Sequence, residues 1–279
     1  MLCCTSFLIW PEVIQISYYG NNFVFDDQYS ENYGLKILTL GSSSAEEIDA
    51  GANVEPFFGA TLKKPTRYLY GISQSNVLSF DMQVISNAVI DGVRRSKISK
   101  WLFGRQNYCR MIIANPEIHD IFFNCFLLNP KGIYIGSHCH GFSFSVECDA
   151  PWAWQNEKTY RFMNSENAYT QRINHYNDSD NTDYTYPHLV ITTGNTGGTI
   201  TFQNNSDNGR QFSVANVRAK EIITVDNDRS IITSTSGLNL SENFNKKFFR
   251  MVSGKNELVI SGDVTKFEMK YSNARKIGG

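Results

Sequence analysis

The sequence predicts a mainly β protein with two domains, residues 1–155 and residues 156–279. Two observations favour strands over helices. Short apolar runs recur along the chain, and asparagine or glycine stands where most of these runs stop. A third observation, 41% hydrophobic and 13% aromatic residues, supplies enough apolar side chains for true cores. We therefore expect a folded, β-rich chain with one convincing helix.

The first predicted strands follow one another through tight turns. Residues 13–16 and 23–25 flank the Gly-Asn-Asn stretch at 20–22, which is typical of a hairpin turn. Residues 33–38 predict a further strand. Residues 77–84 then alternate apolar and polar side chains, as a half-buried strand does.

A long polar segment, residues 41–64, interrupts this series of strands and is rich in serine, alanine and acidic residues. A segment of this length without strand or helix signals is uncommon inside a compact domain and usually has a function. We predict a long loop or an extended arm here. In a protein that assembles, such an arm would embrace a neighbouring subunit.

The predicted helix follows residues 77–84. Asp91 can cap its N-terminus, and Gly104 supplies its stop. Ile98, Trp101 and Leu102 share one face at spacings of three and four residues. The remaining surface carries four basic residues, which favour either a solvated face or docking onto an acidic partner. These residues are Arg94, Arg95, Lys97 and Lys100.

Three further strands complete the first domain, at residues 108–113, 121–126 and 141–148. The last of them alternates strictly, and Pro151 ends it. Its alternation places four apolar side chains on one face. They are Phe142, Phe144, Val146 and Cys148.

The composition changes after Trp154, and we place the domain boundary near residue 155. Residues 164–183 are polar, and we expect the Asp-rich part at 177–183 to be a solvated loop. It lacks the glycine and the terminal glutamate of a calcium loop. Short strands separated by turns follow at regular spacing, which indicates a sandwich or jelly roll. They are predicted at residues 186–193, 198–203, 210–215, 220–225, 229–233, 247–252, 256–261 and 265–271.

Charge and cysteine usage narrow the class of protein. The net charge is −1, which disfavours a general binder of nucleic acid. None of the 6 cysteines forms a C-x-x-C pair, and several lie in apolar runs, as in a protein folded in a reducing cytoplasm. Residues 1–10 lack a basic start and a cleavage site, so we expect no signal peptide. No stretch reaches the length of a membrane span.

The sequence carries no recognisable catalytic motif, and we expect no catalytic residue, cofactor or metal site. His138 and His140 would share a face of a strand and could bind zinc with further ligands. Their spacing matches no established zinc pattern, and the glycines around them predict a hairpin or bend. Trp152 and Trp154 could stack on a sugar, but their place at the domain boundary favours packing between the domains.

The order and spacing of several segments carry a resemblance to a known family. The segments are residues 32–37, 78–84, 98–102, 142–152, 200–206, 210–214, 221–226, 244–248 and 253–262. In this order they resemble the distal tail protein (Dit) family of siphovirus-type bacteriophages, over nearly the whole chain. Two features depart from the family: residues 103–107 lack its usual acidic side chains, and residues 1–10 are unusual.

This resemblance implies a non-enzymatic structural protein at the distal end of the virion tail, made in the host bacterial cytoplasm. The first domain would be tail-tube-like and form a hexameric ring, single or stacked, with the arm reaching the neighbouring subunit. The second domain would be a galectin-like β-sandwich. Implied partners are the tail tube protein, a tail-associated hub or lysin protein, and receptor-binding or adsorption proteins. DNA would pass through the ring without sequence-specific binding, and no membrane insertion is implied.

Two alternatives remain. A carbohydrate-binding β-sandwich that contacts host-surface glycans would need exposed aromatic side chains beside Asn, Asp or Arg on one concave face. A tail-tube subunit is disfavoured by the second sandwich domain.

Overall fold

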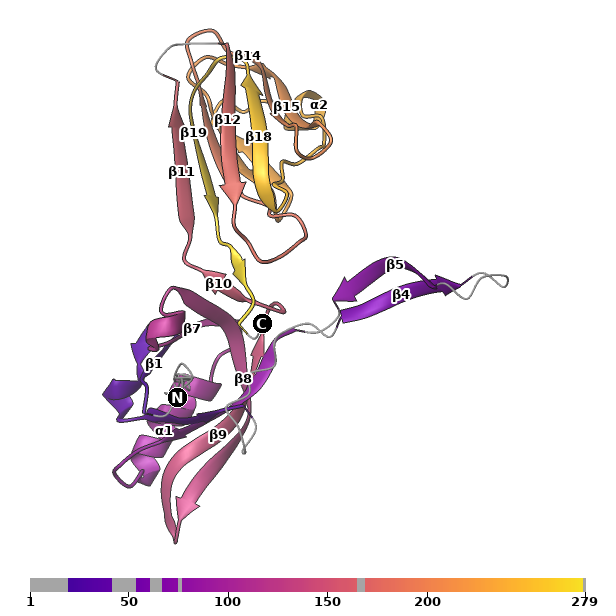
Figure 1. The fold of residues 1–279 in the computed structure, drawn as a ribbon. Coiled ribbons are helices and arrows are strands. Elements are labelled where there is room, and N and C mark those ends of the chain that lie inside the picture. The colour runs from indigo at the N-terminus through magenta and orange to yellow at the C-terminus, as the bar shows by residue number, and fades with distance from the viewer. Residues whose placement is uncertain (1–19, 42–53, 61–66, 75–76, 165–168, 278–279) are drawn as a thin grey trace, which may run out of the picture.

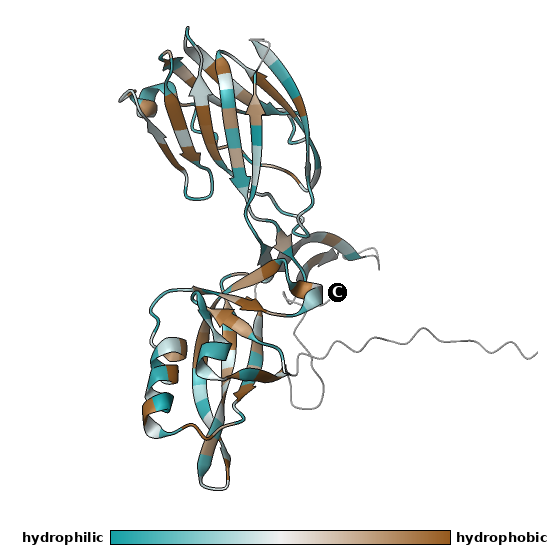
Figure 2. Cartoon of the chain, turned by 90° about the vertical axis from the view of Figure 1, so that its left-hand side faces the viewer, coloured by the Kyte–Doolittle hydropathy of each residue, from teal (hydrophilic) through white to brown (hydrophobic). Residues whose placement is uncertain are grey.

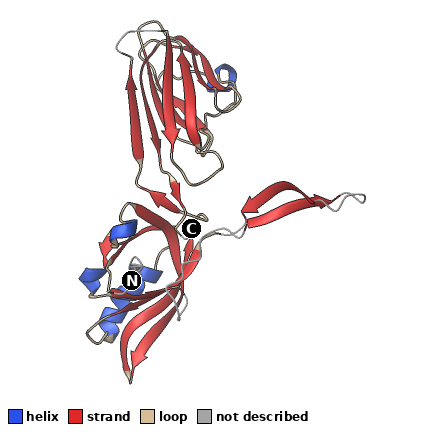
Figure 3. Ribbon diagram, in the orientation of Figure 1, coloured by secondary structure: helices blue, strands red, loops and turns tan. Residues whose placement is uncertain are grey.

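A computed structural model describes residues 20–41, 54–60, 67–74, 77–164 and 169–277. These residues form two β-rich domains stacked end to end, with a two-stranded hairpin projecting away from both (Figure 1). Strands dominate, and helices are few and short (Figure 3). The predicted fold class, mainly β with one helix of some length and an extended arm, is confirmed. No helix in the described ranges is long and apolar enough to cross a membrane.

The first domain is built on an antiparallel sheet with the order β2-β1-β7-β8-β9-β6-β3. Its strands are β1 (Phe23–Phe25), β2 (Gln28–Tyr29), β3 (Lys36–Leu40), β6 (Ser79–Ile85), β7 (Cys109–Ile113), β8 (Ile121–Ile135) and β9 (His138–Cys148). Two 3₁₀ helices, η1 (Ser30–Tyr33) and η2 (Pro116–Ile118), fill the connections. The strand predicted from residue 33 starts later because η1 ends at Gly34, which adopts the left-handed region with φ 61°. Residues 13–16 lie outside the described residues.

The single long helix, α1 (Gly92–Phe103), follows its predicted rules. The Asp91 carboxylate accepts a hydrogen bond from the Arg94 backbone N–H at 2.8 Å, so the N-cap is confirmed. Its predicted apolar face is buried. The Trp101 ring stacks on Tyr33 at 4.2 Å between ring centroids, and its indole N–H donates to the Phe25 carbonyl at 2.8 Å. Such a buried, hydrogen-bonded aromatic anchors a helix, and truncating it typically costs about 3–5 kcal/mol.

Strand β9 confirms the predicted alternation, because its four predicted inward side chains are all buried. Strands β8 and β9 are longer than predicted and continue beyond the core as a hairpin, which turns at Gly136 with φ 62°. The hairpin predicted near Gly136 is therefore confirmed. Gly141 lies inside β9 instead of at the bend, where a Cβ would approach the Val84 carbonyl oxygen to 2.1 Å. That glycine permits close pairing with β6.

The second domain is a sandwich of two antiparallel sheets, ordered β11-β19-β13-β16-β17 and β12-β18-β14-β15. The first sheet contains β11 (Lys158–Met163), β13 (His188–Thr193), β16 (Ile222–Asp226), β17 (Ile231–Ser234) and β19 (Val264–Tyr271). The second contains β12 (Thr170–Asn177), β14 (Gly198–Asn204), β15 (Arg210–Val217) and β18 (Gly254–Ser261). Apolar and polar residues alternate along many of these strands (Figure 2). The inward side chains, among them Phe202, Phe212 and Phe267, form one apolar core.

Two predictions for this domain were wrong. Residues 247–252 form no strand, because the Phe249 N–H bonds the Asn227 side chain at 2.8 Å instead of a neighbouring strand. A short helix, α2 (Leu240–Asn243), precedes this stretch. Strand β12 was missed because it points His175 and Asn177 inward, so its buried face is largely polar in sequence. Strand β11 was also missed, although its Tyr160 and Phe162 alternate with polar residues and pack against the core.

The arm prediction is corrected in its detail. Residues 54–60, predicted to be irregular, form strand β4 (Val54–Ala60), which pairs antiparallel with β5 (Arg67–Gln74). The remainder of the predicted segment, residues 42–53 and 61–64, lies outside the described residues. The arm is thus a β-hairpin whose second strand was not predicted at all.

Candidate functional site: the projecting arm and the interdomain junction

The β4–β5 hairpin carries large apolar side chains in solvent. Phe57 is 57% exposed, Phe58 54%, Leu69 56% and Tyr70 74%. Neighbouring residues of a strand point to opposite faces, so the consecutive Leu69 and Tyr70 place apolar surface on both faces of the hairpin. Among the described strands, β4 and β5 pair with each other and with no third strand. An isolated two-stranded hairpin is marginal in water, so this arm needs another surface to cover it.

Gly59 shapes the arm, because the Tyr70 ring lies over it. A Cβ at Gly59 would stand 1.7 Å from Cε2 of Tyr70. The Arg67 guanidinium lies 5.9 Å from the centre of the Phe58 ring on the same hairpin. The described part of the arm therefore presents aromatic rings together with the Arg67 guanidinium.

The junction between the domains contains two hydrogen-bonded strands. The chain leaves the first domain through β10 (Ala153–Gln155), which pairs with β8. It returns after β19 as β20 (Ala274–Arg275), which pairs antiparallel with β10, and Ile277 packs against the core of the first domain. The second domain is thus connected to the first by two strands.

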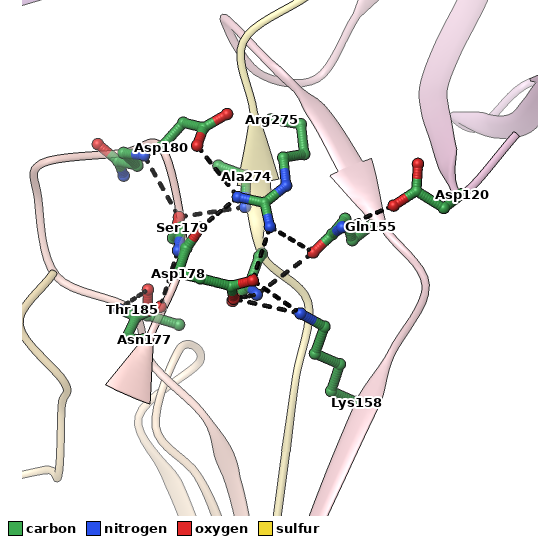
Figure 4. A network of polar contacts seen from close by, with 12 residues as sticks. Asp120, Gln155, Lys158, Asn177, Asp178, Ser179, Asp180, Thr185, Ala274 and Arg275 are labelled. Carbon is green, nitrogen blue, oxygen red and sulfur yellow. Dashed lines mark hydrogen bonds and ion pairs between the residues drawn. The ribbon is translucent and has the colours of Figure 1, made fainter. Parts of the chain in front are cut away.

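A polar network ties these strands to the second domain (Figure 4). The Arg275 guanidinium donates to the Asp178 carboxylate at 2.8 Å, to the Asp180 carboxylate at 3.0 Å and to Oε1 of Gln155 at 2.9 Å. Gln155 in turn donates to Asp120 of the first domain at 2.7 Å. These bonds form one continuous chain from the first domain to the second.

Lys158 completes the network from β11, with Nζ 3.2 Å from the Asp178 carboxylate. Partial burial raises the pKa of Asp178, but hydrogen bonds and charges from Lys158 and Arg275 outweigh that effect. The pKa of Asp178 is therefore held below its ordinary value, and the carboxylate is charged at neutral pH.

The loop at 177–183 was predicted to be solvated, and that prediction was wrong for every second residue from 177 to 181. Asn177, Ser179 and Asn181 are buried, while the aspartates between them reach Arg275. Each buried side chain accepts a hydrogen bond from the backbone N–H two residues on. The Ser179 hydroxyl also accepts from the Ala274 N–H at 3.2 Å. This loop closes the junction, and the signal in the sequence was its alternation of Asp with Asn or Ser.

Trp152 and Trp154 lie at the junction, as predicted from their position. Their rings meet edge to face with centroids 5.8 Å apart, and the Trp154 indole N–H donates to Asp149 at 3.1 Å. Both rings remain partly accessible and line a cavity of about 360 Å³ between the domains. The two tryptophan rings are therefore only partly covered by packing between the domains.

The histidines and cysteines singled out in the sequence form no metal cluster within the described residues. His138 is exposed and His140 is half-buried at the start of β9. Cys109, Cys125 and Cys148 occupy paired positions on β7, β8 and β9. Burial raises the pKa of the Cys148 thiol to about 12 and that of Cys125 well above its ordinary value, so both stay protonated. Cys3 and Cys4 lie outside the described residues.

Two of the basic residues of α1 make hydrogen bonds within the chain, and the other two are exposed. Arg94 is structural, because its guanidinium donates to the Tyr33 carbonyl at 2.6 Å and to the Ser86 hydroxyl at 3.0 Å. Arg95 reaches the Tyr134 hydroxyl at 3.1 Å. Lys97 and Lys100 are exposed, as a solvated face predicts.

Family models match nearly the whole chain. The model of a phage tail protein N-terminal domain matches residues 18–150, and that of a phage tail C-terminal domain matches residues 152–271. Among curated protein sequences, the comparison found no match.

Solved structures show the same fold at low sequence identity. The Dit protein of phage SPP1, described as a paradigm of the hub adsorption apparatus in phages that infect Gram-positive bacteria, superposes with a TM-score of 0.66. It is 9% identical, and the match covers 91% of this chain and 99% of that one. Chains of the phage p2 baseplate, in its activated conformation with Ca or Sr, match with a TM-score of 0.50 at 8% and 9% identity. These matches cover 92% of this chain and 99% of those chains. The expected likeness to distal tail proteins is confirmed for the fold.

Proposed function

We propose that this chain is the distal tail subunit, which joins the tail tube to the adsorption apparatus. The chain belongs to the family of phage tail proteins that those two domain models describe. Its copies form a hexameric ring, single or stacked, at the distal end of the virion tail. The protein works by assembly and carries out no catalysis. It is made in the host bacterial cytoplasm and incorporated into the virion there.

The exposed apolar arm is the observation that carries this proposal. Phe57, Phe58, Leu69 and Tyr70 are more than half exposed when only the described residues are considered. Burying apolar surface contributes about 25 cal/mol per Å². A contact between the arm of one copy and a different surface of the next is heterologous, and such contacts close into a ring when the rotation permits. Each subunit thus gives an arm to one neighbour and receives an arm from the other.

The domains divide the work at a boundary near residue 155. Support comes from the two separate apolar clusters, one built on the sheet around α1 and one inside the sandwich. The first domain forms the ring, with the tail tube protein above and a hub or lysin protein below. The second, galectin-like domain is a platform for receptor-binding or adsorption proteins. The net charge of −1 suits a ring through which DNA passes without being held.

Native mass spectrometry of the full chain across a range of concentrations tests the ring. We expect a species of six times the 31.7 kDa chain mass, or twice that for stacked rings. A strict monomer at every concentration contradicts a ring that assembles from this chain.

A double variant tests the arm itself. Phe58→Ser with Tyr70→Ser should convert the ring to monomers, because both side chains are more than half exposed on the arm. The matched control is Tyr176→Ser with Ile231→Ser, which removes one aromatic ring and one aliphatic side chain that are 69% and 52% exposed on the second domain. If hexameric rings persist in the arm variant, or if the control loses them equally, the arm is not the contact between subunits.

A further inference from the structure

Five aromatic rings line the cavity at the interdomain junction. Trp152 and Trp154 come from the segment that leaves the first domain, Tyr184 and Tyr186 from the loop before β13, and Tyr271 from the end of β19. Its volume of about 360 Å³ lies at the lower end of the range of small-ligand sites, about 300–1,000 Å³. A cavity of this size suits a ligand with one or two rings.

The rings are held in place by contacts outside the cavity. The Arg250 guanidinium lies 3.4 Å from the centre of the Tyr184 ring and also hydrogen-bonds the Tyr186 side chain. Arg250 is itself fixed by the buried Asp207 carboxylate, with contacts of 2.7 and 3.1 Å. Tyr184 and Tyr186 remain 38% and 42% exposed. The walls are therefore preorganised and accessible at the same time.

Unused hydrogen-bonding groups accompany the rings. The Asp228 carboxylate, at the turn between β16 and β17, makes no ion pair within the described part of the chain. The Asn181 side chain also faces the cavity. A donor, the Asn181 amide, and an acceptor, the Asp228 carboxylate, thus line a space bounded by apolar ring faces.

We propose that this junction cavity binds a neutral pyranose unit of a saccharide. A pyranose has C–H faces that pack on aromatic rings and hydroxyls that both donate and accept hydrogen bonds. Asp228 accepts from a hydroxyl, whereas the Asn181 amide donates. A uronic or sialic acid is disfavoured, because its carboxylate would meet that of Asp228 and the aromatic walls offer no cation in exchange.

The proposed saccharide site lies at the junction and depends neither on the arm nor on formation of the hexameric ring. It differs from a sugar site on the face of the sandwich, because the rings of Trp152 and Trp154 precede the second domain in sequence. Binding here and ring formation are therefore separate properties, and one can fail without the other.

Binding is tested on the full chain with methyl glycosides of glucose, galactose, mannose, rhamnose, N-acetylglucosamine and N-acetylgalactosamine, and with methyl glucuronide as the charged probe. Saturation-transfer NMR identifies contact, and tryptophan fluorescence reports it because Trp152 and Trp154 line the cavity. We expect at least one neutral glycoside to bind saturably with a Kd of about 1 mM, as suits a single weakly held sugar unit. We expect methyl glucuronide to bind at least tenfold more weakly than that neutral glycoside.

Variants locate the site. Tyr186→Ala and Asp228→Asn should each weaken binding at least tenfold, whereas Tyr186→Phe, which keeps the ring, should stay within about threefold of the wild type. Tyr176→Ala, on β12 and 69% exposed, is the control and should bind as the wild type does. Circular dichroism and the oligomeric mass verify that each variant folds.

Four results would overturn the assignment. They are no binding by any neutral glycoside, tighter binding of glucuronide, equal binding by the wild type and both cavity variants, and an equal loss in the Tyr176 control. Ring formation in native mass spectrometry is read separately, so a failed ring does not count against the cavity.

Discussion

The arm and the junction use opposite kinds of surface. The arm exposes phenylalanine, leucine and tyrosine on both faces of a hairpin that pairs only with itself among the described strands. The junction joins charged and amide side chains of both domains in one hydrogen-bonded chain from Asp120 to Lys158. The arm leaves its apolar side chains exposed, whereas the polar network of the junction pairs side chains of the same chain with one another.

The difference shows what each kind of contact is suited to. Burial of apolar area is non-directional, and the favourable free energy is proportional to the area buried. Covering the exposed apolar side chains of the arm would therefore favour association. Hydrogen bonds contribute only about 1 kcal/mol each in net stability, but they are directional. The junction therefore fixes an angle between domains more than it stabilises either of them.

The largest expected effect comes from removing the returning segment, residues 272–279, which carries β20 and Ile277. The second domain keeps its core because β19 ends at Tyr271. The first domain should lose about 2 kcal/mol, a fall in Tm of roughly 5 °C, and calorimetry should resolve two transitions. Removing residues 278 and 279 alone is the control. An unchanged single transition in the longer deletion would mean that the junction couples nothing.

Arg275→Met should have a smaller effect. It leaves Asp178 and Asp180 without their shared cation, and we expect a loss of about 1–2 kcal/mol in urea unfolding. The figure is below that for a fully buried pair because the Asp178 side chain is 44% exposed. Arg161→Met is the matched control, since this arginine pairs with Glu268 but is itself 67% exposed. If both variants lose the same free energy, the junction pair is no different from an ordinary surface pair.

Acid should weaken the second domain beside the junction. Burial lowers the pKa of His175, whose ring lies 5.1 Å from Tyr160 and 5.4 Å from Tyr271. Because the unfolded state binds the proton more readily, this contribution to stability is complete above the ordinary histidine pKa of about 6.5 and declines as the pH falls below it. Urea unfolding at pH 7 and pH 5 measures the decline, and His175→Phe should flatten it. An equal slope in the variant would assign the acid sensitivity to other groups.

The smallest expected effect is on the arm. In monomeric chains, Phe58→Ser with Tyr70→Ser should change the free energy of unfolding by less than about 0.5 kcal/mol, because exposed side chains contribute little to their own fold. A loss above about 1 kcal/mol would show that the arm packs on its own subunit, and the contrast with the junction would disappear.

Local rules predicted much of the fold. The Asp91 cap, the buried Trp101 face of α1 and the alternation from Phe142 to Cys148 all depend on side chains near in sequence. Most strands of the sandwich were also found, since turns separate runs that alternate. Strand β12 lacks that signal, because it buries His175 and Asn177 among polar neighbours. Strand β11 carries the signal over only two apolar positions, Tyr160 and Phe162.

The candidate sites depend on distant residues and were less predictable. Arg275 meets Asp178 across 97 positions, and no local pattern brings them together. The arm was expected from its length and composition, but its strand character was not, because Tyr68, Leu69 and Tyr70 do not alternate. Apolar residues in a row predict burial, and here they remain exposed within this chain.

The paired strands β10 and β20 also have a mechanical consequence. A single peptide crossing between two bodies is a swivel, because rotation about a few backbone bonds costs little. Two crossings paired side by side form a ribbon, and twisting it breaks this pairing, including the hydrogen bond from the Gln155 N–H to the Asn273 carbonyl. Torque applied to the second domain is thus transmitted to the first. The sandwich domain therefore keeps a fixed orientation relative to the first domain.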